Sequence, residues 1–388
     1  MKLALIGVGQ AGGKIADALL EYDERTGSRV VQSAVAFNTA KTDLRGLDHI
    51  PSSNRVLIGR SRVKGHGVGA DNELGAEIAR EDGEEIVGAL DAIPVHEVDA
   101  FLVVAALGGG TGSGAGPVII NRLQEIYAEP VYGLAVLPGG DEGGIYALNA
   151  ARSLKTFVRE ADNLLLFDND AWRQSGETVG GGFESINDEI ARRFGVLFSA
   201  GEVDAGSEIA QSVVDSSEII NTLSGGGIST VGYATESLEG ETEEGLLSRF
   251  SDDEPAFTEN AGGVNRIASL VRKATLGRLT LPADVSSTER ALVVVAGPPE
   301  VLTRKGIERA RKWIEDETGC LEVRGGDYPL PGEDQIAAVV LLSGVTDVPR
   351  IESMQQVAVD AKDAIESQEA AHEAKMEEMT DDRLDSLF

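Results

Sequence analysis

The most constraining feature of this sequence is a glycine-rich segment, Gly-Gly-Gly-Thr-Gly-Ser-Gly at residues 108–114, which directly follows an apolar run at 100–107. The run predicts a strand buried on both faces, and the residues from Pro117 onward predict a helix. Glycines leave backbone N–H groups uncovered, and a helix start adds the positive end of its dipole. The segment therefore predicts a site for an anion such as a phosphate, with a flexible glycine turn as the alternative.

Further glycine-rich loops follow other predicted strands in the first half of the chain, at residues 7–14, 65–72 and 138–144. Each loop precedes residues whose apolar positions have helical spacing, so this half predicts a repeated strand–loop–helix unit and a parallel sheet. The carboxyl ends of parallel strands share one edge, so we expect the loops to converge on one ligand. Their number favours a nucleotide with several phosphates over a single phosphate ion.

The first loop does not fit either of the two common nucleotide-binding patterns. It contains the G-x-G-x-x-G spacing of dinucleotide sites, but the next predicted strand ends at Asn38, where such a site needs an acidic residue. A Walker loop needs Ser or Thr after its lysine, and Ile15 follows Lys14. An NAD-dependent dehydrogenase stays an alternative that leaves residues 108–114 unexplained.

The second half of the chain has a different character. A long helix is predicted at 183–198, and a second, smaller α/β domain follows it. The acidic segment 236–260 predicts an exposed loop, and residues 377–388 predict a frayed end. The remaining predicted elements are helices at 209–223, 264–276, 302–314 and 351–375, and strands at 228–235, 291–296 and 337–342. The predicted divisions are a nucleotide-binding domain at 1–182, the central helix at 183–200, a C-terminal domain at 201–349, and a C-terminal helix and acidic tail at 350–388.

Composition narrows the classes of partner. The net charge is −31 over 388 residues, which argues against nucleic acid and anionic membranes as partners and is typical of salt-loving organisms. No apolar run approaches the roughly 20 residues that span a bilayer. The single cysteine, Cys320, excludes an internal disulfide and a cysteine metal cluster, and the four scattered histidines show no zinc-like spacing. We expect a cytoplasmic protein without a membrane segment.

Residues 108–114 resemble the signature of the tubulin and FtsZ superfamily, and the other loops follow in the same order. The Gly-Gln-Ala-Gly-Gly-Lys loop at 9–14 and the acidity are most similar to the haloarchaeal CetZ group. The resemblance implies an α/β fold: a parallel-sheet GTPase domain, a long central helix and a smaller α/β C-terminal domain. It also implies GTP or GDP as the ligand, with Mg²⁺ held by the phosphates near Gln10 and no direct protein ligand.

The resemblance assigns roles to the loops residue by residue. Residues 9–14 would wrap the inner phosphates, 69–72 would sense the γ-phosphate, and 108–113 would hold the β- and γ-phosphates. Glu142 would bind the ribose, although Tyr146 replaces a basic residue nearby. Asn169 and Asn187 would read the guanine edge and Phe183 would stack on the base. Phe183 and Asn187 also lie one helical turn apart, which suits a purine. The full set implied is Gly9, Gln10, Ala11, Gly12, Gly13, Lys14, Asn38, Gly69, Ala70, Asp71, Asn72, Gly108, Gly109, Gly110, Thr111, Gly112, Ser113, Pro138, Glu142, Asn169, Phe183 and Asn187.

The resemblance places the catalytic acids on the next subunit of a filament. The matching residues are Asp215 and Glu218, which are three positions apart and face one way from a helix start. Val213 replaces an Asn of the FtsZ pattern, so one polar contact is lost. Carboxylates can orient or deprotonate water beside a phosphate. The alternative is that the two acids only cap a helix.

The predicted function is a tubulin-like cytoskeletal GTPase that polymerises head-to-tail and controls cell shape or motility. The predicted partners are further copies of the chain, with possible lateral sheets, and adaptor proteins at the C-terminal tail. An FtsZ-like division protein and a nucleotide-gated structural lattice with little turnover are the alternatives.

Overall fold

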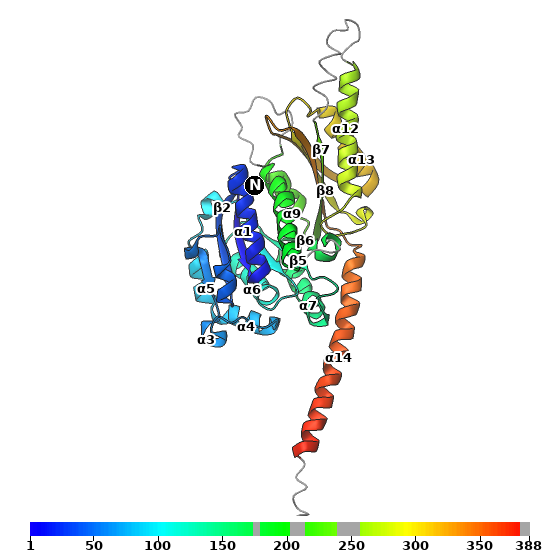
Figure 1. Cartoon of the computed structure of the whole chain (residues 1–388). Helices are drawn as coiled ribbons and strands as arrows, with labels where there is room; N and C mark the ends of the chain where they lie inside the picture. Colours follow the sequence, from blue (N-terminus) through cyan, green and yellow to red (C-terminus); the bar gives the residue numbers. More distant parts are fainter. Residues whose placement is uncertain (174–178, 202–213, 239–256, 381–388) are drawn as a thin grey trace, which may run out of the picture.

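Ten strands form one continuous sheet in the computed structural model, which describes residues 1–173, 179–201, 214–238 and 257–380. The strand order is β3-β2-β1-β4-β5-β6-β7-β10-β8-β9 (Figure 1). The first seven of these pair in parallel, β10 is antiparallel to both of its neighbours, and β9 is parallel to β8. The strands are β1 (Leu3–Val8), β2 (Val31–Asn38), β3 (Arg55–Leu57), β4 (Ala100–Ala106), β5 (Val131–Leu137), β6 (Asn163–Asp168), β7 (Ile228–Ser237), β8 (Arg290–Gly297), β9 (Glu322–Pro329) and β10 (Gln335–Ser343).

Helices cover both faces of the sheet, so its central strands are buried on both sides, as the continuous apolar runs predict. One core contains side chains of α1, α9 and α10. The other contains side chains of α4 to α7 and of α12 to α14. The helices are α1 (Gly9–Thr26), α2 (Lys41–Arg45), α3 (Arg60–Val63), α4 (Asn72–Glu81), α5 (Gly83–Leu90), α6 (Thr111–Ile126), α7 (Gly144–Glu160), α8 (Asn169–Trp172), α9 (Val179–Ser199), α10 (Ser216–Leu223), α12 (Phe257–Leu276), α13 (Arg304–Thr318) and α14 (Pro349–Thr380).

Two predicted helical segments and one strand differ from the expectation. The residues after the loop at 65–72, expected to be helical, form the two helices α4 and α5, because the chain leaves helical geometry at Asp82, whose side chain accepts a hydrogen bond from the Gly59 N–H at 2.6 Å. The helix expected at 209–223 begins only at Ser216, and residues 209–213 lie outside the described part. The edge strand β9 was not predicted, since its two glycines interrupt the apolar pattern. One of them, Gly325, lets β8 approach closely: a Cβ there would lie 2.6 Å from the Val293 carbonyl oxygen.

The fold class expected from the sequence is confirmed, but the strands of the second half continue the first sheet instead of forming a separate one. The joining strands β6 and β7 pair at only two positions, Leu164 with Ile228 and Leu165 with Ser229. A buried amide strengthens this seam. Asn163 Nδ2 lies 3.0 Å from the Leu223 carbonyl oxygen and 2.9 Å from that of Gly226, and its Oδ1 accepts from the Ser229 hydroxyl at 2.7 Å.

The last helix, α14, starts at the sheet, packs along α7 and then runs beyond the body of the molecule (Figure 1). Met354 and Ala358 are buried, whereas residues 366–377 are all exposed. The helix expected at 351–375 is therefore confirmed and extends to Thr380. The end predicted to fray, 377–388, is helical up to Thr380, and 381–388 lie outside the described residues, as does most of the acidic segment 236–260.

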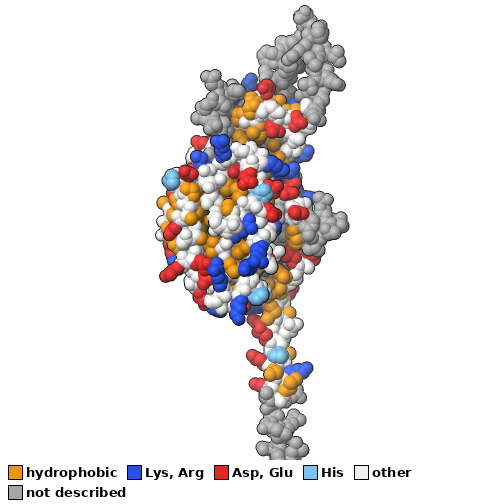
Figure 2. All heavy atoms as spheres, turned by 60° about the vertical axis from the view of Figure 1, so that its left-hand side comes forward, with side chains coloured by type: hydrophobic (Ala, Val, Ile, Leu, Met, Phe, Trp, Pro, Cys, Tyr) orange, Lys and Arg blue, Asp and Glu red, His pale blue; other side chains and the backbone are white. Residues whose placement is uncertain are grey.

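Acidic side chains are spread over the body and along α14, interleaved with basic ones (Figure 2). This distribution agrees with the high negative charge of the whole chain. Within the described residues, no helix has the length and apolarity that a bilayer crossing requires.

We predict that Asn163→Ala destabilises the protein by about 2–3 kcal/mol, because it strands several buried polar groups at the seam. Asn121→Ala, on the exposed surface of α6, provides the control and should change the unfolding free energy by less than about 0.5 kcal/mol. Denaturant unfolding measures both. Equal effects of the two substitutions would show that the Asn163 amide does not hold the seam.

Candidate functional site

A cavity of about 580 Å³ opens at the carboxyl ends of the parallel strands, where the glycine-rich loops converge as predicted. This volume falls in the usual range for a small-molecule or cofactor site. The predicted site residues that line it are Gly9, Gln10, Ala11, Lys14, Asn38, Gly69, Ala70, Gly108, Gly109, Gly110, Thr111, Gly112, Pro138, Glu142, Asn169, Phe183 and Asn187.

Five predicted site residues do not line this cavity. Gly12 and Gly13 lie in α1, where Gly12 allows contact with β4: a Cβ there would lie 2.1 Å from the Val104 carbonyl oxygen. Asp71 caps α4 by accepting from the Leu74 N–H at 2.9 Å. Asn72 and Ser113 line a different cavity, between α4, α6 and α7.

Two long helices, α1 and α6, begin at the wall of the cavity. Neither has a side-chain cap or an acidic residue in its first turn, so their first N–H groups stay uncovered. The two starts approach closely because glycine occupies both: a Cβ on Gly9, whose φ is +75°, would lie 2.8 Å from the Gly112 nitrogen. Gly109 faces open space. This end of the cavity is therefore suited to an anion with several charged oxygens.

Buried polar contacts fix the loops around this anion site. The Asn149 amide nitrogen, from α7, donates to the Ala70 carbonyl at 2.7 Å and to the Gly108 carbonyl at 3.0 Å. The hydroxyls of Thr39 and Thr111 lie 2.7 Å apart. Loops that are distant in the sequence are thus joined before any ligand binds, which lowers the ordering cost of binding.

The other end of the cavity is shaped for a flat polar ring. Phe183 and Asn187 lie one turn apart on α9, and Phe183 is 38% exposed. Asn169, at the start of α8, is 7% exposed, and its Oδ1 has no hydrogen-bond partner within the described protein. Buried amide oxygens are nearly always paired, so this one is free to accept a hydrogen bond from a ligand or a water in the cavity.

The loop after β5 is held by residues far apart in the sequence. Arg350 of α14 donates to Asp168 at 3.0 Å and to the Pro138 carbonyl at 2.7 Å. Burial raises the pKa of Asp168, and the Arg350 guanidinium opposes this shift. Glu142 accepts from the Gly139 N–H at 2.7 Å, so it also shapes this loop.

Several cavity residues were not among those predicted. Most of them are next to a predicted loop residue in the sequence, and this proximity was the only signal that could have identified them. No local pattern pointed to Arg350, which reaches the site only through the tertiary fold. The lining residues that were not predicted are Val8, Ile15, Ala40, Thr42, Asp43, His66, Gly67, Val68, Ala106, Val136, Leu137, Tyr146 and Ile186.

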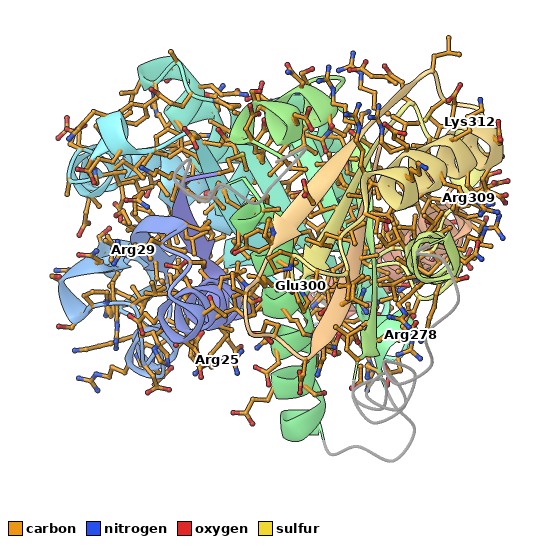
Figure 3. The ribbon with its side chains drawn as sticks, turned by 90° about the horizontal axis from the view of Figure 1, so that it is seen from above. Arg25, Arg29, Arg278, Glu300, Arg309 and Lys312 are labelled. Atoms are coloured by element: carbon orange, nitrogen blue, oxygen red, sulfur yellow. The ribbon has the colours of Figure 1, made fainter. Side chains whose placement is uncertain are left out.

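Asp215 and Glu218 lie at the opposite end of the molecule. A Cβ on Gly201 would lie 2.8 Å from the Met1 nitrogen and 3.0 Å from the Ser216 nitrogen, so α10 starts beside the beginning of β1. The cavity lies at the other end of this strand, whose six residues span roughly 20 Å at about 3.3 Å each. Figure 3 views the molecule from above and labels Arg25, which lies in the last turn of α1, away from the cavity where that helix begins. Both acids are therefore too distant to act in the cavity of their own subunit.

Asp215 caps α10, because it accepts hydrogen bonds from the Ser217 hydroxyl and from the Glu218 N–H at 3.1 Å. The Ser217 hydrogen bond lowers the pKa of Asp215. Glu218 is half-buried, and burial together with the Asp215 charge raises its pKa, with Arg324 and Arg311 opposing. The capping role considered from the sequence thus holds for Asp215, while Glu218 is a carboxylate with raised basicity on the surface of this end.

Residues 2–177 match the family model described as "Tubulin/FtsZ family, GTPase domain". Residues 176–360 match the model described as "Tubulin-like CetZ, C-terminal domain". Tubulin-like protein CetZ1 of Haloferax volcanii is 66% identical over 370 residues, 94% of each chain. The solved GDP-bound monomer of CetZ1 from Haloferax volcanii aligns with a TM-score of 0.83 at 62% identity, covering 93% of this chain and all of that one. The GTPγS-bound protofilament of CetZ2 from the same organism gives 0.82 at 47% identity, covering 94% of this chain and 100% of that chain.

Ionisation of Glu218 should lower the free energy of unfolding, because the pKa of Glu218 in the folded protein is raised above the ordinary value of 4.5. The cost is absent below that value and develops as the pH rises through the folded pKa. We therefore expect Glu218→Gln to raise the melting temperature relative to the unmodified chain at pH 7 and to leave it unchanged near pH 4. Melting curves across this range test the sign, and a lower melting temperature at pH 7 would contradict it.

Proposed function

The chain belongs to the CetZ group of the Tubulin/FtsZ family and contains that family's GTPase domain, and from this premise we propose that it binds GTP, polymerises head-to-tail and hydrolyses the GTP between subunits. The observation that carries this proposal is the separation of the cavity from Glu218 at opposite ends of one subunit. The two meet only when the α10 end of one copy contacts the cavity end of the next. Repeating such a contact generates an open filament.

GTP suits the two ends of the cavity. Its phosphates would lie at the starts of α1 and α6, where N–H groups are uncovered and Gly109 faces open space. Its guanine would lie near Phe183 and Asn187. The unpaired Asn169 oxygen is an acceptor, which matches the N–H donors on the guanine edge and not the acceptor at the same position of adenine.

Mg²⁺ would be held by the phosphates near Gln10, because the described residues contain no cluster of His, Cys, Asp or Glu that is able to hold a metal. When bound, the ion would neutralise charge on the transferred phosphoryl group. The chain's own residues orient the nucleotide, and Glu218 of the neighbouring copy orients the attacking water and accepts its proton. An isolated subunit should therefore hydrolyse GTP slowly.

Two relatives support this reading. The solved CetZ1 structure carries GDP, and the solved CetZ2 structure is a protofilament with GTPγS. Control of cell shape or motility is the cellular role that we propose for such filaments, with division as the alternative. Lateral sheets, adaptor binding at the tail and a cytoplasmic location stay hypotheses.

Asn169→Ala should weaken GTP binding by roughly 10- to 100-fold, because guanine loses a buried acceptor. Since the Oδ1 is unpaired in the protein alone, the substitution should not lower the melting temperature of the nucleotide-free chain. Calorimetric titration with GTP and with ATP measures the change. Unaltered GTP affinity would remove Asn169 from the guanine site.

Mixing two defective chains tests the shared site. Glu218→Gln should bind GTP normally and hydrolyse it poorly. Gly109→Asp places a carboxylate in the open space of the phosphate end, so it should fold but not bind GTP. In an equal mixture, roughly a quarter of the junctions pair an intact GTP site with an intact Glu218, and turnover should recover up to that fraction.

The measurement is phosphate release by each chain alone and by the mixture. No recovery, with both chains folded and Glu218→Gln still binding GTP, would contradict hydrolysis between subunits. Full activity of Glu218→Gln alone would exclude Glu218 as the water-activating acid.

A further inference from the structure

Leu321 is the most exposed large hydrophobic residue in the described part of the chain. Its side chain is 96% exposed, although its neighbour Cys320 is buried at 5%. It lies between the end of α13 and the start of β9, on an ordered segment. Single exposed hydrophobic side chains are common on protein surfaces, so the exposure of Leu321 matters only through its position relative to the candidate site.

Leu321 lies at the α10 end of the molecule. The next residue, Glu322, pairs in the sheet with Arg290, the first residue of β8, and forms an ion pair with it at 3.2 Å. Arg290 Nη1 in turn donates to the carbonyl of Asn221 in α10 at 2.9 Å. Leu321 therefore occupies the same end as Glu218, which the proposed filament contact covers.

Two other exposed hydrophobic side chains lie toward the opposite, cavity end. Ile145 is 43% exposed and precedes the cavity residue Tyr146. Leu276 is 60% exposed and lies at the end of α12. The segment after it meets the carboxyl end of β6, since the Asp168 N–H donates to the Thr280 carbonyl at 2.8 Å. Ile145 and Leu276 are called the apolar rim below.

We propose that Leu321 is an apolar anchor of the head-to-tail contact and packs against the apolar rim of the next copy. This inference rests on the proposed function and names the residues that hold the two ends together. Its occupant is a second copy because the apolar side chains lie at both ends that the filament brings together, in a chain whose net charge of −31 makes copies repel. The free energy gained by burying an apolar side chain does not depend on the net charge of the chain. Salts that are excluded from the protein surface make this burial more favourable.

The contact is heterologous, because Leu321 and the apolar rim lie on different ends. A chain that lacks the anchor still presents an intact rim and an intact nucleotide site. It should therefore join a filament by one end and block growth at the other.

The first test uses full-length Leu321→Ser, with Met376→Ser as the matched control. Met376 is 47% exposed on the part of α14 that runs beyond the body of the molecule, away from both the anchor and the rim. Losing one buried leucine should raise the critical concentration for assembly with GTPγS by roughly 10- to 100-fold. GTP binding and melting temperature should stay unchanged, and Leu321→Met should restore assembly. Sedimentation in molar salt measures the critical concentration.

The outcomes separate this inference from the proposed function. Equal critical concentrations for Leu321→Ser and Met376→Ser would overturn the anchor while leaving head-to-tail assembly standing. Failure of the unmodified chain to sediment with GTPγS would instead overturn the proposed function. A loss of GTP binding in Leu321→Ser would also overturn the anchor, since it would assign Leu321 a role within one subunit.

The second test uses the polarity of the filament, whose two ends expose different surfaces of the subunit. Leu321→Asp, added at a few per cent to the unmodified chain, should shorten filaments far more than dilution does, and labelled Leu321→Asp should lie at filament ends in electron micrographs. Incorporation along the filament, or shortening equal to that of Met376→Asp, would contradict the anchor.

Discussion

Two helix starts converge on one cavity with no side chain between them, and the rest of the site depends on this contact. Gly9 and Gly112 bring the first turns of α1 and α6 so close that a single Cβ would separate them. The uncovered N–H groups then face the same space, with the two dipoles adding. The amide of Asn149 and the Thr39–Thr111 pair hold the surrounding loops in this arrangement.

Two polar groups at the candidate functional positions have surroundings that lower the stability of the isolated subunit. The Asn169 oxygen is buried with no partner among the described residues, and the charge on Glu218 is disfavoured by burial and by Asp215. Both features cost stability in the isolated subunit. Such unsatisfied groups are typical of functional positions, where stability is lower than local packing allows.

The parallel sheet gives the subunit two unlike ends. The glycine-rich loops and the apolar rim lie at the end of the subunit where the carboxyl ends of the parallel strands meet. The opposite end, at the amino ends of these strands, contains α10 and Leu321. Under the proposed function, a site divided between these ends is incomplete in one subunit, so geometry would couple catalysis to assembly. Arg350 links the cavity loops to α14, which extends the fold beyond the sheet.

The sequence alone determined the family, the fold class and the glycine-rich loops that converge on the cavity, because glycine spacing and buried strands are local patterns that set backbone geometry directly. It also placed Phe183 and Asn187 on one helix face, which depends only on helical periodicity. The tertiary structure decided the rest. The single sheet joined at Asn163, the unpredicted β9, the helix break at Asp82 and the reach of Arg350 depend on partners distant in sequence. Whether Gly12 lines a ligand site or packs on β4, and which end of the molecule carries Glu218 and Leu321, follows from how the chain folds back on itself, which no local pattern encodes.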